Sequence, residues 1–167
     1  MLMASRIIVD GYNLIGSEKG LRGNLQGQRD RLIQDLRKYQ ERKGYLITVV
    51  FDGWRAGWIY ETEERYGDLT VIYSRQGEKA DSVIKRLAKE IGSACIVVTS
   101  DRELRQAVEV NGATAIYTSE FKAKLHGSGE TRAAIEHSSV PLSRRKKGNA
   151  RRLPKRERKR RERLKGL

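Results

Sequence analysis

Ile7-Ile8-Val9-Asp10-Gly11-Tyr12-Asn13 begins with three branched apolar residues and then changes to an acid and a glycine. Such a run is typical of a short strand that a parallel sheet buries on both faces. Asp10 therefore follows a predicted central strand at its carboxyl end, the edge at which open α/β sheets bind ligands. Asn13 is close enough in sequence to face the same crevice. Taken alone, the stretch is equally compatible with Asp10 capping a turn.

Acids recur at the ends of other predicted elements, which favours a functional interpretation of Asp10. They are Asp52 after the strand 46–51, Asp81 in the first turn of a helix over 79–91, and Asp101 after the strand 96–99. Asp52 is followed by a glycine, as Asp10 is. Ser100 and Glu103 fit a capping box, which would place Asp101 at the first helical position. For Asp81, the favourable interaction of an acid with the dipole of the helix would by itself explain its position in the first turn.

Apolar periodicity divides the rest of the chain into further strands and helices. Strands are expected at 69–73, at the edge of the sheet, and at 114–117; helices are expected over 24–43, from 101 to about 111 and over 119–125; a loop is expected from 14 to 23. This alternation predicts a three-layer α/β domain with a mostly parallel central sheet. Because crossovers are right-handed, the acids that follow strands should gather at one edge.

Four clustered carboxylates without a basic residue among them repel one another unless a cation lies between them. Oxygen ligands of this kind suit Mg²⁺ or Mn²⁺, and such an ion can activate water and stabilise charge on a phosphodiester. His126 and His137 fall in the region with the least predicted order, so no Ser-His-Asp or Cys-His set competes. The sequence has neither a Walker A motif nor G-x-G-x-x-G after the first strand, which argues against nucleotide-binding classes.

The positive charge is concentrated near one end of the sequence. Residues 143–167 contain fourteen Lys and Arg against Glu157 and Glu162, so they carry +12 of the net charge of +14. We expect a nuclease-like domain at 1–126, a linker at 127–142 and a basic tail at 143–167, too highly charged for a core and either disordered or helical only when bound. The charge favours nucleic acid as the partner; a tail that serves only solubility is the alternative.

Other bulk features narrow the class of protein. No apolar run approaches the roughly 20 residues that a membrane span needs. No secretory signal is visible, and the single cysteine, Cys95, lies in a predicted core strand. These features predict a cytoplasmic protein with no membrane partner and no small-molecule cofactor beyond a metal ion.

Several basic residues are candidates for binding RNA. Arg55 lies in Trp54-Arg55-Ala56-Gly57-Trp58, whose rings either stack on unpaired bases or merely anchor a loop to the domain. The other candidates follow strands or lie in the tail: Arg75, Arg102, Arg144, Arg145, Lys146, Lys147, Arg151, Arg152, Lys155, Arg156, Arg158, Lys159, Arg160 and Arg161.

Four motifs, in this order and spacing, resemble the NYN domain, a relative of PIN-domain nucleases. They are Val9-Asp10-Gly11-Tyr12-Asn13-Leu14, Val50-Phe51-Asp52-Gly53, Glu78-Lys79-Ala80-Asp81 and Thr99-Ser100-Asp101-Arg102. The sequence is most similar to the YacP-like branch, which includes a ribosome-associated endonuclease that cuts messenger RNA. The resemblance covers roughly Arg6 to Leu125 and does not extend to the basic segment after Pro141.

The resemblance implies a PIN-like fold and metal-dependent hydrolysis of RNA, with messenger RNA as the expected substrate and the ribosome as a second candidate partner. It implies that Asp10, Asp81 and Asp101 hold Mg²⁺ or Mn²⁺, and that Asn13 and Ser100 are the accompanying polar residues. Asp52 matches a further acid of the family, which completes the candidate catalytic set.

Two other functions are alternatives to an endoribonuclease. One is a non-catalytic RNA- or ribosome-binding protein that keeps the acidic pocket as a remnant; the retention of every acid argues mildly against it. The other is a phosphatase of the haloacid-dehalogenase type, which also has an acid after its first strand. That class needs a second aspartate two residues on, where this sequence has Tyr12.

Overall fold

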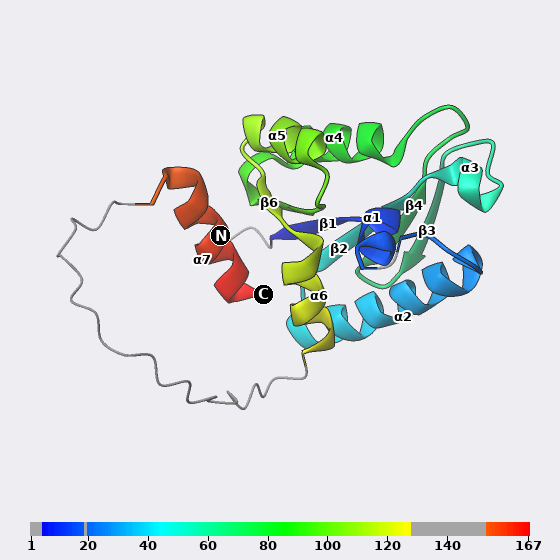
Figure 1. Ribbon diagram of the computed structural model, residues 1–167, viewed down its shortest axis with the longest axis horizontal. Coiled ribbons are helices and arrows are strands. Elements are labelled where there is room, and N and C mark those ends of the chain that lie inside the picture. The colour runs from blue at the N-terminus through cyan, green and yellow to red at the C-terminus, as the bar shows by residue number, and fades with distance from the viewer. Residues whose placement is uncertain (1–4, 19, 128–152) are drawn as a thin grey trace, which may run out of the picture.

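The stretch that begins with Ile7 forms β1 (Arg6–Asp10), an inner strand of a six-stranded sheet. The computed structural model describes residues 5–18, 20–127 and 153–167. Within them the strand order is β3-β4-β2-β1-β5-β6, and every pairing is parallel except that of β3 with β4 (Figure 1). The other strands are β2 (Leu46–Phe51), β3 (Thr62–Tyr66), β4 (Leu69–Tyr73), β5 (Cys95–Val98) and β6 (Thr114–Ile116).

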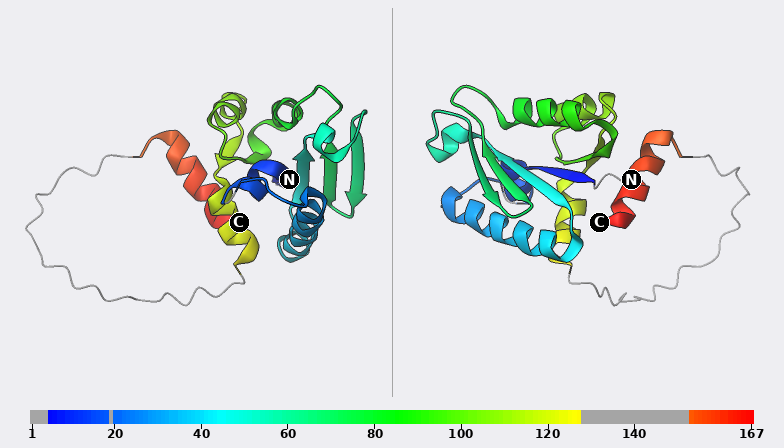
Figure 2. Two further views of the ribbon diagram at one scale, coloured as in Figure 1. Left: turned by 45° about the vertical axis from the view of Figure 1, so that its right-hand side comes forward. Right: turned by 180° about the vertical axis from the view of Figure 1, so that it is seen from behind.

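Helices cover both faces of the sheet, which confirms the predicted fold class (Figure 2). On one face lie α1 (Gly11–Gly16), α2 (Leu25–Lys43) and α6 (Thr118–His126); on the other lie α4 (Ala80–Ile91) and α5 (Arg102–Val110). The short α3 (Gly53–Ala56) follows β2, and the 3-10 turn η1 (Gly92–Ala94) precedes β5. None of the helices in these ranges is long and apolar enough to cross a membrane.

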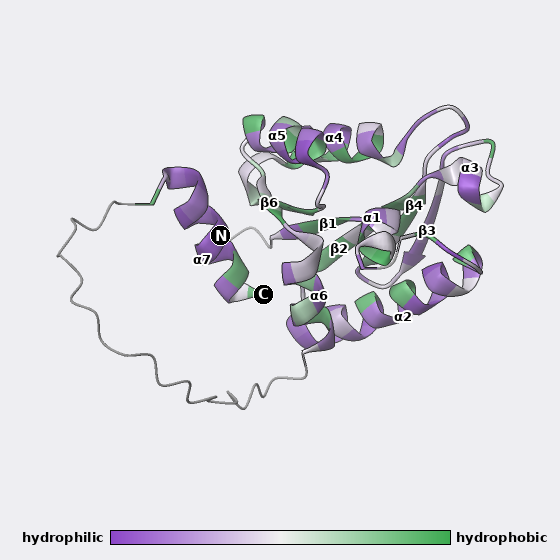
Figure 3. Cartoon of the chain, in the orientation of Figure 1, coloured by the Kyte–Doolittle hydropathy of each residue, from purple (hydrophilic) through white to green (hydrophobic). Residues whose placement is uncertain are grey.

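The apolar run of β1 is buried on both faces because successive side chains of a strand point in opposite directions. Ile7 and Val9 pack in the core beneath α2 and α6, whereas Ile8 packs beneath α4 and α5. Figure 3 shows the same division, with apolar colour on the sheet and on the helix faces turned toward it. Cys95 is buried in this second core, as predicted, and burial raises the pKa of its thiol to about 12.

The long helix α2 has the boundaries that its sequence predicts. The Asn24 side chain caps it by accepting a hydrogen bond from the Gly27 N–H at 3.1 Å. The helix ends at Gly44, whose φ of 71° lies in the left-handed region that favours glycine. Its buried face presents Leu36 and Tyr39 to the sheet.

Among the predictions of loops and of strand order, two were wrong. Part of the expected loop over 14–23 is helical, because α1 extends from Gly11 to Gly16. The strand 69–73 is not at the edge, because β3 pairs with it in an antiparallel hairpin. β3 consists of the largely charged segment Thr62–Tyr66 and therefore lacks the apolar run by which the other strands were recognised. Charged side chains are common on edge strands, where they discourage pairing with other chains.

The end of the basic segment also differs from the expected tail, since α7 (Lys155–Gly166) is helical and packs beside β6 (Figure 1). Leu164 and Leu167 join the core beneath α2. The hydroxyl groups of Tyr39 and Tyr45 donate hydrogen bonds to the carbonyl oxygens of Leu167 and Gly166. A segment that we expected to be excluded from any core therefore contributes two leucines to one.

Acidic side chains and carbonyl groups of the domain offset the charge of α7. This explains why α7 is a helix docked on the domain and not the tail that we expected. Arg156 and Arg160 pair with Glu109 and Glu120, respectively. The Lys159 ammonium donates to the Gly112 carbonyl oxygen at 2.6 Å, and the Arg163 guanidinium donates to the Ser93 carbonyl oxygen at 3.1 Å. The expected linker, apart from Gly127, and the basic residues from 144 to 152 lie outside the described residues.

Candidate active site

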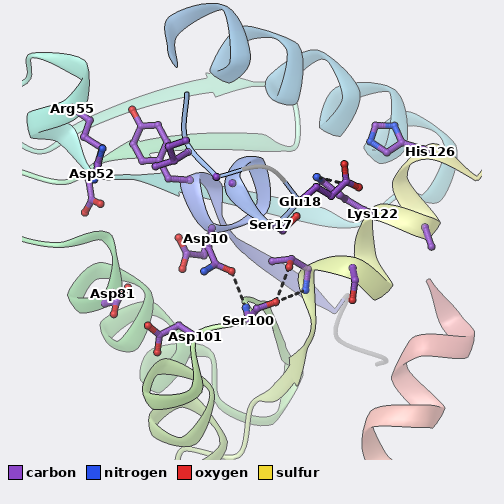
Figure 4. Close-up of a pocket in the computed structure, with 18 residues that line it drawn as sticks. Asp10, Ser17, Glu18, Asp52, Arg55, Asp81, Ser100, Asp101, Lys122 and His126 are labelled. Carbon is purple, nitrogen blue, oxygen red and sulfur yellow. Dashed lines mark hydrogen bonds and ion pairs between the residues drawn. The ribbon is translucent and has the colours of Figure 1, made fainter. Parts of the chain in front are cut away.

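A pocket of about 820 Å³ lies at the carboxyl edge of the sheet, where β1 and β5 are neighbours. The chain leaves β1 toward β2 on one side and later crosses to β5 on the other, with α2 and α4 on opposite faces. Such a switch point is where open α/β sheets bind ligands. All six residues of the predicted catalytic set line this pocket: Asp10, Asn13, Asp52, Asp81, Ser100 and Asp101 (Figure 4).

Asp10 is the most buried acid of the pocket, with 7% of its surface exposed. The Thr99 hydroxyl donates a hydrogen bond to Asp10 Oδ2 at 3.1 Å. Burial raises the pKa of Asp10 to about 7, and the negative charges of Asp81 and Asp52 add to the increase; the hydrogen bonds from Thr99 and the Asn13 backbone oppose it. The negative charges of Asp81 and Asp52 therefore lie close enough to Asp10 to oppose its ionisation.

Asp81, on the other side of the pocket, is also repelled by neighbouring carboxylates. It lies in the first turn of α4, and its pKa is raised by burial and then by the charges of Asp101 and Asp52, against the opposing effect of Lys85. Figure 4 shows Asp10, Asp81 and Asp101 around the same opening. Asp81 is thus affected by Asp101 and itself affects Asp10, so repulsion links the three acids.

Asp52 connects the end of β2 to the beginning of α4. Its Oδ1 accepts a hydrogen bond from the Ala80 N–H at 2.6 Å, which holds the turn that carries Asp81. The next residue has no room for a side chain, because a Cβ on Gly53 would lie 1.7 Å from the Ser74 carbonyl oxygen. The Asp-Gly sequence after β2 thus positions two segments of the pocket against each other.

The predicted capping box at the start of α5 was wrong. Asp101, and not Ser100, is the N-cap, and its Oδ1 accepts a hydrogen bond from the Leu104 N–H at 2.9 Å. Ser100 is engaged elsewhere: its N–H donates to Asn13 Oδ1 at 2.8 Å, and its hydroxyl lies 2.6 Å from the Thr118 hydroxyl. Ser100 therefore links the turns that follow β1, β5 and β6, and it holds Asn13 in place.

Several residues in or next to the pocket were missed in the sequence. Thr99 supports Asp10, Thr118 supports Ser100, Lys122 lines the pocket and pairs with Glu18 at 3.6 Å, and His126 lines it from the end of α6. His126 was thus wrongly assigned to a region of little order. Thr118 was recognisable, because it follows β6 at the edge where Asp10 follows β1. Lys122 is then one helical turn further on.

The candidate RNA-binding residues divide into three groups. Arg55 lines the pocket, whereas Arg75 pairs with Glu78 at 3.3 Å and Arg102 is exposed at the start of α5. Of the six candidates in α7, three contact the domain and three are exposed to solvent. Those in contact are Arg156, which also remains largely exposed, Lys159 and Arg160. The exposed three are Lys155, Arg158 and Arg161. Those from Arg144 to Arg152 lie outside the described residues.

The donor groups of the pocket fit a hard divalent cation, since they are carboxylate, amide and hydroxyl oxygens. As they stand, however, no group of three or more His, Cys, Asp and Glu side chains within the described ranges is arranged to hold a metal ion. Mg²⁺ commonly keeps several waters and binds through one or two carboxylates together with substrate phosphate. The pocket fits that kind of site and not a cage made by protein alone.

Asp10 should make the stability of the metal-free protein depend on pH. Its ordinary pKa of 3.8 applies to the unfolded chain and about 7 to the folded one, so the unfolded state loses its proton first as pH rises. The free energy of unfolding should therefore fall between about pH 4 and pH 7, by an amount on the order of a few kcal/mol. Urea unfolding in EDTA, with Asp10→Asn for comparison, measures this, and equal pH dependence in both proteins would contradict it.

Together these features define an α/β domain with an acidic pocket at its topological switch point. The family model of the YacP-like NYN domain matches residues 7–165. YacP of Bacillus subtilis (strain 168), a curated but uncharacterized protein, is 30% identical over 157 residues, which is 92% of this chain and 81% of that protein. The chain belongs to the YacP-like NYN domain family, a PIN-like nuclease family.

Solved structures of the family share the fold. The crystal structure of a point mutant of Rae1 (YacP) from Bacillus subtilis matches with a TM-score of 0.60 and 30% identity, over 74% of this chain and 75% of that one. A second crystal structure of Rae1 (YacP) matches with a TM-score of 0.57 and 30% identity, over 71% and 72% of the two chains. The family match runs to residue 165 and so includes the basic segment, which the resemblance over Arg6 to Leu125 had left out.

Proposed function

We propose that this protein is an endoribonuclease that hydrolyses RNA with the help of Mg²⁺ or Mn²⁺. The observation that carries the proposal is the acidic pocket at the switch point, where Asp10 is buried and its pKa is raised in part by Asp81 and Asp52. Clustered carboxylates of this kind repel one another, and a divalent cation bound between them would relieve that repulsion. Membership in a PIN-like nuclease family supports the same conclusion.

Each residue of the candidate catalytic set has a proposed part in the reaction. Asp10, Asp81 and Asp101 would hold the ion, directly or through water. When bound, the ion supplies an activated water and positive charge beside the scissile phosphodiester. Asn13 and Ser100, which are hydrogen-bonded to each other, would orient the ligands or the phosphate. Asp52 belongs to this set through the hydrogen bond by which it holds the first turn of α4.

The proposed substrate is messenger RNA in the cytoplasm, with the ribosome as the second partner. Arg55 at the pocket and the exposed basic residues of α7 would contact the sugar–phosphate backbone. Contacts of this type supply affinity that does not depend on sequence, so they do not by themselves select a cleavage site.

Removal of the metal ion should abolish cleavage. The test is incubation of end-labelled RNA with the protein in Mg²⁺, in Mn²⁺ or in EDTA, each with and without purified ribosomes. We expect cutting in either metal and none in EDTA, because without a cation the carboxylates repel one another and the scissile phosphate. Cleavage that persists in EDTA would contradict metal dependence. Tight binding with no cutting under any condition would instead identify a non-catalytic RNA- or ribosome-binding protein.

A further inference from the structure

A run of large apolar side chains is exposed on the segment that follows Gly53. Trp54 of α3 is 57% exposed, Trp58 is 40% exposed, and Ile59 and Tyr60 are still more exposed. Exposed apolar residues in one contiguous segment usually mark a surface that binds another molecule. This segment begins directly after Asp52, so it adjoins the acidic pocket.

Arg55 connects the exposed rings to the pocket. Its guanidinium lies over the Trp54 ring at 4.6 Å and over the Tyr12 ring at 5.8 Å, and Arg55 and Tyr12 both line the pocket. Figure 4 shows Arg55 beside Asp52 at the pocket wall. The segment therefore offers a flat aromatic face and a positive charge next to each other, at the entrance to a site whose other charges are largely negative.

Backbone hydrogen bonds hold this segment in one conformation. The Trp58 N–H donates to the Gly53 carbonyl oxygen at 2.9 Å, and the Gln76 N–H donates to the Ile59 carbonyl oxygen at 3.0 Å. Further along, Glu61 pairs with Arg86 at 2.7 Å. A ring presented on a fixed backbone loses little conformational freedom when a ligand stacks on it.

The two tryptophans have different environments. The Trp58 ring packs against Tyr73, with 5.7 Å between ring centroids, so it helps to anchor the segment to β4. The Trp54 ring, in contrast, makes a cation–π contact with Arg55. Trp58 therefore anchors the segment, whereas the Trp54 ring is exposed and available to a ligand.

We propose that Trp54 and Arg55 form a subsite for one unpaired nucleotide next to the scissile phosphate. The base stacks on the exposed face of Trp54, and the Arg55 guanidinium contacts the adjoining phosphate. Aromatic side chains beside cations are the usual means of holding single-stranded RNA, because every base has a face that can stack. The subsite rests on the proposed function and assigns two residues, one aromatic and one basic, to holding the nucleotide beside the cut.

Intrinsic fluorescence tests the subsite directly, because Trp54 and Trp58 are the two tryptophans of the chain. In an Asp10→Asn background, which is expected to slow cleavage strongly, Trp58→Phe leaves Trp54 as the reporter, and Trp54→Phe leaves Trp58. Titration with oligoadenylate should quench Trp54 emission and protect it from acrylamide, with a much smaller effect on Trp58. Unchanged Trp54 emission at concentrations that saturate binding, measured by anisotropy of labelled RNA, would overturn the proposal and assign the patch to a protein partner.

Affinity measurements with matched variants provide a second criterion. Trp54→Ala should weaken binding of oligoadenylate roughly 5- to 100-fold, while Trp54→Phe, which keeps a ring, should restore most of it. Tyr60→Ala removes an exposed ring from the same segment but leaves the Trp54–Arg55 contact, so it should have little effect. Equal losses in Trp54→Ala and Tyr60→Ala would overturn the assignment. Because quenching does not require cleavage, a protein that binds without cutting would disprove the nuclease and leave the subsite intact.

Discussion

Asp10→Asn is expected to reduce cleavage of RNA roughly 100- to 1,000-fold, since loss of one carboxylate from a metal site removes several kcal/mol of transition-state stabilisation. Asparagine has nearly the same shape and still accepts the hydrogen bond that the Thr99 hydroxyl donates to Asp10. The fold and the affinity for RNA should therefore persist. Initial rates on end-labelled RNA in Mn²⁺, together with anisotropy of labelled RNA, separate the two quantities.

Asp68→Asn is the matched control for this change. Asp68 lies between β3 and β4, outside the pocket, where its carboxylate accepts a long hydrogen bond of 3.3 Å from Gln40. The same change of charge at this position should leave the cleavage rate nearly unaltered. If Asp10→Asn cleaves as fast as Asp68→Asn, then Asp10 takes no part in the reaction and the assignment of the pocket fails.

The second large effect is expected for the exposed side of α7. Replacement of Lys155, Arg158 and Arg161 by Gln should weaken RNA binding roughly 10- to 50-fold near physiological salt and reduce the slope of log affinity against log salt by about 2, if each residue contacts one phosphate of a single strand. These side chains are exposed, so the helix should remain docked through Leu164 and Arg160. Binding measured over a range of salt concentrations gives both values.

A variant with the same net charge distinguishes local contact from the general field of the protein. Lys38, Lys43 and Lys89 are exposed on α2 and α4, so their replacement by Gln lowers the charge equally without altering α7. This variant should show a much smaller change in salt slope. Equal slopes in the two variants would indicate that α7 attracts RNA only through its share of the total charge.

The candidate catalytic acids could be placed from sequence because their positions depend on a local pattern and one topological rule. Asp10, Asp52 and Asp101 each end a buried apolar run, and parallel strands bring such ends to the same edge. The local pattern was not enough to place Asp81 in the pocket, because the helix dipole by itself accounts for an acid in the first turn of a helix. Its place in the pocket depends on Asp52 receiving the hydrogen bond that holds the start of α4.

The supporting contacts could not be placed in the same way, because their partners are far apart in sequence. Ser100 and Glu103 have the spacing of a capping box, but the Thr118 hydroxyl competes for the Ser100 side chain, and Asp101 takes the cap instead. For α7, composition indicates only self-repulsion. The acids that offset it, including Glu109 and Glu120, belong to other helices and come beside it only once the chain has folded.

The position of α7 has a consequence for the protein while it is being synthesised. β6 is the last strand of the sheet on its side, and α7 lies beside it. An uncovered strand edge is a template on which another chain can add a strand. During synthesis β6 leaves the ribosome well before residues 155–167, so the nascent domain has an open edge until the helix emerges and docks. A chain that terminates early would keep that edge open, and it would be prone to associate with its own copies.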